Sequence, residues 1–151
     1  MAYMDRQWDD TLGFVRSQYA ETKFKFGDHL TETLWYSLGL LLRDNGTDHD
    51  RAVAAIHRVL DTQYDFPSSS FHGTFRRTPE EPAEPPAPVF EYHSFDPNWR
   101  EFCGTTLVLL LVEYETILPT DLAARIIRAL RLATDGTWKR QSAPPRYTKS
   151  H

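Results

Sequence analysis

Residues 96–114, DPNWREFCGTTLVLLLVEY, decide the predicted fold of this chain. Asp96 is a suitable N-cap, and Pro97 suits the first position of a helix, where a missing N–H costs no hydrogen bond. The residues that follow are apolar on nearly every side of the predicted helix, and such a helix has to be covered by other protein segments. Its longest apolar run, 107–112, is much shorter than the ~20 residues that span a bilayer, so no membrane span is expected.

Helices that are apolar all round alternate along the chain with amphipathic helices. The spacing of the apolar residues, together with the stop signal Asn45-Gly46, predicts four helices at 29–43, 50–62, 97–117 and 119–134. Short connections within each pair favour antiparallel packing. This alternation is typical of stacked αα-hairpins with an inner and an outer layer, so the predicted fold is all-α, a partial (α/α) toroid. No sheet of three or more strands is expected.

One more amphipathic helix is predicted at 5–20, and a breaker, Gly27, follows it. Its apolar stripe falls at steps of four, three and four residues, at Trp8, Leu12, Val15 and Tyr19. At the other end of the chain, Gly136 is predicted to stop the last helix. A single helical domain is therefore expected at 1–136, and 137–151 is expected to be a loose tail.

The composition excludes several classes of protein. The chain has 151 residues, of which 40% are hydrophobic and 25% charged, as in an ordinary single globular domain. The net charge is −4 and the basic residues are scattered, so the sequence indicates no positively charged patch that would attract nucleic acid. One cysteine forms no internal disulfide, and no histidine or cysteine spacing fits a metal site, so neither a metal nor a cofactor is expected. The N-terminus lacks an apolar signal core, and a cytoplasmic location is expected.

The connection between the two predicted hairpins, 63–96, is the candidate site. Ordered domains seldom carry a structureless connection longer than ~12–15 residues unless it is functional or disordered. Both ends of this one are rich in aromatic and charged residues, whereas residues 79–88 form an acidic, proline-rich strap. The ends are therefore expected to pack as the walls of a site.

Asp65 and His72 are the candidate catalytic residues. Two carboxylates that face a cleft suit glycoside hydrolysis, and Asp65 and Asp96 flank the connection. Asp96 is favoured as an N-cap, and Asp65 could equally bind backbone in a turn. His72 precedes a glycine that permits a sharp turn, and its imidazole could act as an acid or base or simply bond a carbonyl.

Five further residues are candidates for substrate binding: Tyr64, Asn98, Trp99, Arg100 and Glu101. A tryptophan offers an apolar face for a sugar ring, and an arginine can hold a carboxylate through two hydrogen bonds. For Trp99 the core of the fold is the favoured alternative, and for Tyr64 an anchoring role is favoured. Arg100 enters an apolar helix and needs a partner, which Glu101, Asp65 or a ligand acid would supply.

Four segments carry a resemblance to known proteins: VLDTQYD (59–65), HGTF (72–75), residues 96–114, and LPTDLAARI (118–126). Together they resemble uncharacterised fungal and bacterial α/α-toroid proteins, distantly similar to six-hairpin glycosidases and α/α-toroid polysaccharide lyases. The resemblance covers roughly residues 30–136. It implies that the chain is only the N-terminal part of a toroid, because six hairpins of ~40–47 residues need a much longer chain.

Two functional hypotheses follow, and whether the protein is an enzyme stays open between them. In the first, it is a carbohydrate-binding or carbohydrate-active protein with a saccharide or uronic acid as ligand. In the second, it is a non-catalytic helical-repeat module that binds an unknown partner. A partial toroid would also leave apolar helix faces exposed, so self-association through them is expected.

Overall fold

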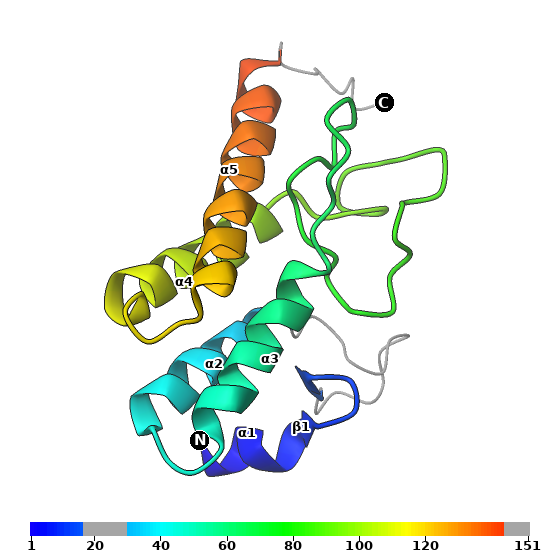
Figure 1. The fold of residues 1–151 in the computed structure, drawn as a ribbon. Coiled ribbons are helices and arrows are strands. Elements are labelled where there is room, and N and C mark those ends of the chain that lie inside the picture. Colours follow the sequence, from blue (N-terminus) through cyan, green and yellow to red (C-terminus); the bar gives the residue numbers. More distant parts are fainter. Residues whose placement is uncertain (17–29, 144–151) are drawn as a thin grey trace.

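A computed structural model describes residues 1–16 and 30–143 of the chain (Figure 1). The described residues form five helices and one short β-hairpin. The elements are α1 (Ala2–Gln7), β1 (Trp8–Asp9), β2 (Phe14–Val15), α2 (Leu30–Arg43), α3 (Asp48–Leu60), α4 (Trp99–Tyr114) and α5 (Thr120–Ser142). The mainly helical class is thus confirmed, and within the described ranges the only sheet has two strands.

Two antiparallel helix pairs form the body of the protein (Figure 1). Helix α2 packs on α3, α4 packs on α5, and α2 also contacts α4, so one core runs through both hairpins. Leu34 and Leu40 of α2 and Leu107 and Leu110 of α4 are completely buried in that core. The two predicted helix pairs are therefore present, and a closed ring is not part of the described structure.

The predicted helix at 5–20 is wrong beyond its first residues. Helix α1 ends at Gln7, and Trp8–Asp9 then pairs with Phe14–Val15 as an antiparallel hairpin. The carboxylate of Asp9 accepts the backbone N–H groups of Thr11 and Leu12, and Gly13 has φ +76. These local bonds offer the backbone an alternative to the helix, which spacing alone does not show. Tyr19 and the predicted connection around Gly27 lie outside the described residues.

The end of α5 also differs from the prediction. Gly136 does not stop the helix, which continues to Ser142, so residues 137–142 are helical rather than loose. A glycine lowers helix stability but does not forbid a helix, and here Gly136 is buried against the connection. The remainder of the predicted tail, 144–151, lies outside the described residues.

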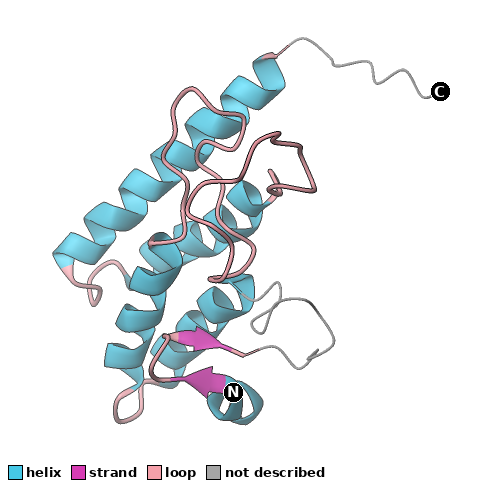
Figure 2. Ribbon diagram, turned by 90° about the vertical axis from the view of Figure 1, so that its right-hand side faces the viewer, coloured by secondary structure: helices cyan, strands magenta, loops and turns pink. Residues whose placement is uncertain are grey.

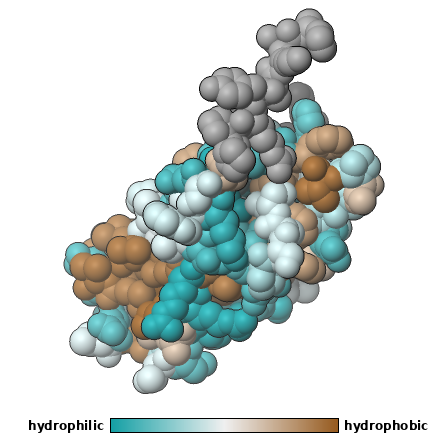
Figure 3. Space-filling model, turned by 90° about the horizontal axis from the view of Figure 1, so that it is seen from above, coloured by the Kyte–Doolittle hydropathy of each residue, from teal (hydrophilic) through white to brown (hydrophobic). Residues whose placement is uncertain are grey.

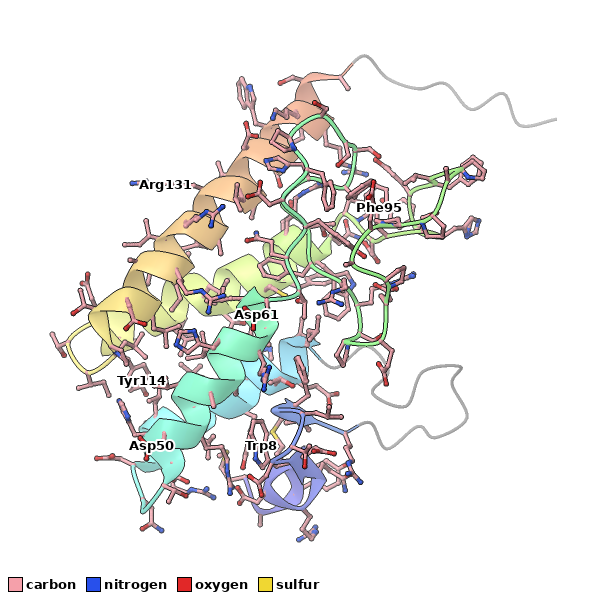
Figure 4. All side chains as sticks on the ribbon, turned by 45° about the vertical axis from the view of Figure 1, so that its right-hand side comes forward. Trp8, Asp50, Asp61, Phe95, Tyr114 and Arg131 are labelled. Atoms are coloured by element: carbon pink, nitrogen blue, oxygen red, sulfur yellow. The ribbon has the colours of Figure 1, made fainter. Side chains whose placement is uncertain are left out.

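The long connection folds onto the helices around a small core of its own. Tyr64, Phe71 and Phe95 are buried together, and Phe66 and Val89 pack against them. The rings of Tyr64 and Phe71 meet edge to face, with centroids 5.3 Å apart. Figure 2 shows the connection as loops beside α4 and α5, and Figure 4 places Phe95 within it. The prediction of packed ends is therefore confirmed.

In the part of the chain that the structure describes, no helix is both long enough and apolar enough to cross a bilayer.

Acid should weaken the ion cluster that joins the N-terminus to the α2–α3 hairpin. Arg43 donates to the carboxylates of Asp5 and Asp48, and these bonds hold the pKa of both carboxyls below the usual value. A pKa that is lower in the folded state adds stability above the unfolded value of ~4, and this stability is lost as the pH falls through the folded pKa. The urea midpoint should therefore fall from pH 5 to pH 2.5.

Asp48→Asn is the matched control for this pH dependence. Asp48 is 5% exposed, and its replacement keeps the side-chain shape while it removes the titrating group. The variant should be less stable than the unmodified protein at pH 7, and it should lose less stability on acidification. Parallel pH profiles for the two proteins would contradict this assignment.

Candidate functional site

Arg100 lies at the junction between the connection and the helices, and it is 2% exposed. Its Nε and Nη2 donate to the carbonyl oxygen of His72 at 3.0 and 2.8 Å, and Nη2 also donates to the carbonyl oxygen of Ser70 at 2.8 Å. Burial lowers the pKa of the guanidinium, and the negative charges of Glu101 and Glu91 oppose this shift from a distance.

The expected carboxylate partner of Arg100 is therefore wrong. The guanidinium bonds instead to the backbone carbonyls of His72 and Ser70 in the turn at residues 70–73. Two neutral acceptors satisfy Nε and Nη2 but leave the positive charge without an adjacent counterion among the described residues. The prediction that the connection brings His72 to Arg100 is confirmed, through the backbone of His72 rather than its ring.

Two glycines let the connection approach α5 this closely. A Cβ on Gly73, whose φ is +74, would overlap the carbonyl oxygen of Leu132. A Cβ on Gly136 would overlap the carbonyl oxygen of His72 and would lie 2.6 Å from Nε of Arg100. Backbone therefore meets backbone at this crossing, with the Arg100 guanidinium clamped beside it.

The His72 ring is buried between two carboxylates. Its Nε2 lies 3.1 Å from Oδ2 of Asp135, and its Nδ1 lies 3.8 Å from Oδ1 of Asp65. The second distance is too long for a hydrogen bond, and Nδ1 has no partner within the described structure. The ring is only 2% exposed, so a substrate would reach it only if the connection moved.

Both carboxylates that flank His72 are held by cations of α5. Asp65 accepts from Arg128 at 2.8 Å, and Asp135 accepts from Lys139 at 2.6 Å. The Lys139 bond is the main cause of the lowered pKa of Asp135, to which His72 also contributes. Lys139 further donates to the carbonyl oxygen of Pro67. This network ties the connection to α5, and it places Asp65 and His72 together as predicted.

The other predicted residues are distributed over the two cores and the surface. Tyr64 is 2% exposed and donates to the carbonyl oxygen of Pro82, and burial raises the pKa of its hydroxyl to about 12. Trp99 is buried in the main core. Asn98 donates its backbone N–H to Asp96, whose carboxylate thus caps the first turn before α4. Glu101 is exposed and accepts from Thr137.

An open groove between α4 and α5 was not predicted from the sequence. Its volume is about 520 Å³, and it is lined by Arg100, Glu101, Gly104, Thr105, Val108, Leu130, Ala133, Thr134, Thr137, Trp138 and Gln141. A second hollow of about 550 Å³ shares Leu130, Thr134 and Trp138 with it and continues past Arg131. Of the predicted residues, Arg100 and Glu101 line this groove, and Glu101 is the exposed one of the two.

Exposed apolar side chains lie on the same two helices as this groove, and Val108 and Trp138 are among the residues that line it. Phe102, Val108, Leu109 and Val112 of α4 and Ile127 and Trp138 of α5 are all more than a third exposed, and Trp138 reaches 71%. Seen from above, hydrophobic residues gather on the side of the molecule where α4 lies in Figure 1 (Figure 3). We call these six residues together with the groove the α4–α5 face. The sequence indicates this face in one respect, since the segment that forms α4 is apolar on all sides. In the structure, α2 and α5 cover only part of that helix.

A family model for a domain of unknown function, DUF8769, matches residues 1–148. The chain belongs to this family. Neither the curated proteins nor the solved structures contain a match to it.

The burial of reactive side chains limits the chemistry that this DUF8769 domain can perform. Among the residues described here, no three histidine, cysteine or acidic side chains come together as metal ligands do. Cys103 is buried in the core, and burial raises the pKa of its thiol. His72 lies inside the contact between the connection and α5, whereas the Asp65 side chain beside it is 40% exposed and pairs with Arg128. The α4–α5 face is accessible and carries both apolar and charged groups.

Proposed function

We propose that this domain is a non-catalytic binding module whose α4–α5 face receives an apolar segment of a partner protein. The observation that carries the proposal is the open groove together with the exposed apolar side chains of the two helices that form it. Isolated apolar residues are common on protein surfaces, but contiguous apolar patches mark interaction sites. A groove between two antiparallel helices is also a usual docking place for an amphipathic helix.

The burial of His72, one of the two candidate catalytic residues, supports the same choice, although the side chain of the other, Asp65, is 40% exposed. The contact between His72 and Asp135 holds the connection against α5, and the bonds of the buried Arg100 hold it against α4. A glycosidase needs two carboxylates that flank a substrate cleft. Here Asp65 and Asp135 flank a buried imidazole and are engaged by Arg128 and Lys139.

Photo-crosslinking within cells of the source organism tests this proposal. A photoreactive residue placed at Val108, which is 47% exposed on the α4–α5 face, should yield a discrete covalent adduct with a partner protein. The matched control carries the same residue at Asp50, an exposed position of α3 that Figure 4 labels. Adducts at Asp50 but not at Val108, or at neither position, would contradict the proposal.

A saccharide ligand is the second candidate, and one observation favours it. The exposed indole of Trp138 borders the groove beside Glu101, Thr137 and Gln141, which offer polar groups to sugar hydroxyls. Titration calorimetry with neutral sugars and uronic acids tests this candidate, and Trp138→Ala should abolish any binding seen. The largely apolar lining of the groove favours the protein partner over the sugar.

Three further predictions from the sequence, namely a toroid, self-association and a cytoplasmic location, are part of this proposal. The hairpins would continue into a toroid if further αα-hairpins packed on α4. Self-association would occur if the segment that fills the α4–α5 face came from a second copy, in which case the adduct at Val108 would contain two copies of the chain. The cytoplasm is the compartment in which we propose that the module acts.

A further inference from the structure

Three residues of α5 belong to both hollows of the α4–α5 face: Leu130, Thr134 and Trp138. Side chains at this spacing lie along one stripe of a helix, about one turn from each other. Thr134 and Trp138 are exposed, and Leu130 is partly buried. The stripe therefore has a small side chain in its middle and a large one at each end, and the groove beside it reaches Val108 of α4.

This order of side chains fits a second copy of α5 that runs in the opposite direction. In an antiparallel pair centred on Thr134, each Trp138 lies beside Leu130 of the other copy, and the two threonines meet at the twofold axis. In a parallel pair the two indoles would meet each other, and they would hold the helices apart at that end. The antiparallel pair also sets the two helix dipoles in opposite directions, which is favourable.

The charges beside the stripe suit the same arrangement. Arg131 and Asp135 line the adjoining hollow with opposite charges, and no ion pair joins them within the described ranges. Arg131 extends from α5 on the side away from the connection (Figure 4). A face with both signs of charge is matched by a copy of itself, which also carries both. A twofold axis at Thr134 brings the same edge of each helix together, so Arg131 comes beside Trp138 and Asp135 of the second copy, where a cation–π contact and an ion pair can form.

From this shape and these charges we infer that the α4–α5 face is the interface of a twofold-symmetric dimer, in which α5 of each copy packs antiparallel on α5 of the other at Thr134. The inference rests on the proposed function and names its partner, a second copy of this chain. Each copy covers Val108, Leu130 and Trp138 of the other. Because the contact buries apolar surface, the dimer should persist at high salt, which also screens the repulsion between two chains of net charge −4.

Disulfide crosslinking of the complete chain locates the twofold axis. Only a residue on the axis meets its own counterpart, so Thr134→Cys should form a covalent dimer under mild oxidation. Cys103 is buried and does not compete. Ile127→Cys and Gln141→Cys are the matched controls on α5, since each cysteine would lie roughly 21 Å along the helices from its own counterpart but close to the other cysteine. Each control alone should stay uncrosslinked, and an equimolar mixture of the two should crosslink.

Sedimentation velocity measures the contribution of the apolar contact. The unmodified chain should sediment as a dimer at micromolar concentration, in low and in high salt. Trp138→Ala should raise the dissociation constant of the dimer about tenfold or more, because a tryptophan at the centre of an interface commonly dominates binding. Trp35→Ala is the matched control: Trp35 is 57% exposed on α2, outside the α4–α5 face, and its removal should leave the dimer unchanged.

Several results would overturn the inference. A monomeric chain would do so, as would a dimer in which Thr134→Cys stays uncrosslinked or in which Ile127→Cys crosslinks on its own. Equal effects of Trp138→Ala and Trp35→Ala would also exclude this interface. The proposed function is decided separately: it stands if the adduct at Val108 contains a different protein, and it falls if no adduct forms there.

Discussion

Replacement of Gly136 by alanine should destabilise the protein, although an alanine normally stabilises the interior of a helix. The added Cβ would overlap the carbonyl oxygen of His72 and crowd Nε of Arg100. Overpacking of this kind typically costs about 1–3 kcal/mol, which outweighs the ~0.5–1 kcal/mol that alanine gains over glycine in a helix. For a domain of this size, a net loss of about 2 kcal/mol corresponds to roughly 4–8 °C in the thermal midpoint.

Gly104 provides the matched control in the neighbouring helix. A Cβ there would have Leu130 Cδ2 as its nearest neighbour, at 3.8 Å, which is an ordinary contact. Gly104→Ala should therefore raise the free energy of unfolding by about 0.5–1 kcal/mol. Thermal unfolding of the two variants measures the difference. Equal and small shifts would show that the connection does not press on α5 at Gly136.

The second large effect is expected from Arg100→Ala. The substitution removes three hydrogen bonds from a charged donor and leaves the carbonyls of His72, which is buried, and of Ser70 without them. Bonds of this type contribute about 1.5–3 kcal/mol each, and the burial cost of the guanidinium offsets part of their sum. We expect a net loss of about 2–4 kcal/mol, measured by urea denaturation, with Arg131→Ala within ~0.5 kcal/mol of the unmodified protein as an exposed control.

Hydrogen exchange would locate the change that Arg100→Ala causes. The amides of Gly73 and Tyr64 bond across the base of the connection, to the carbonyls of Tyr64 and Thr74. In the variant these amides should lose protection before those of α2, because Arg100 holds the connection to α4 whereas α2 lies in the main core. Uniform loss of protection across both regions would indicate that Arg100 supports the whole fold instead.

These two experiments also bear on how the candidate site was predicted. In the sequence, candidate functional residues lie at both ends of the connection. The structure brings three of them to one junction: Asp65, His72 and Arg100. The spacing of these residues in the sequence could not show which partner atoms each side chain contacts. An arginine finds carbonyl oxygens as readily as carboxylates, and only the path of the turn at residues 70–73 puts those oxygens within its reach.

The sequence by itself determined the helices whose signals are local. Asn45-Gly46, Pro119 and the carboxylate of Asp96 mark where helices end or begin, and apolar periodicity marks which of their faces are buried, because these effects act within a few residues. The tertiary structure alone decided the rest. Gly136 continues a helix because its partner is distant in the chain, the backbone of His72. The hairpin at residues 8–15 combines the local turn at Asp9 with a distant contact, the packing of Trp8 on Tyr36. The open α4–α5 face is likewise tertiary, since local sequence shows that α4 is apolar but not which of its sides a neighbour leaves uncovered.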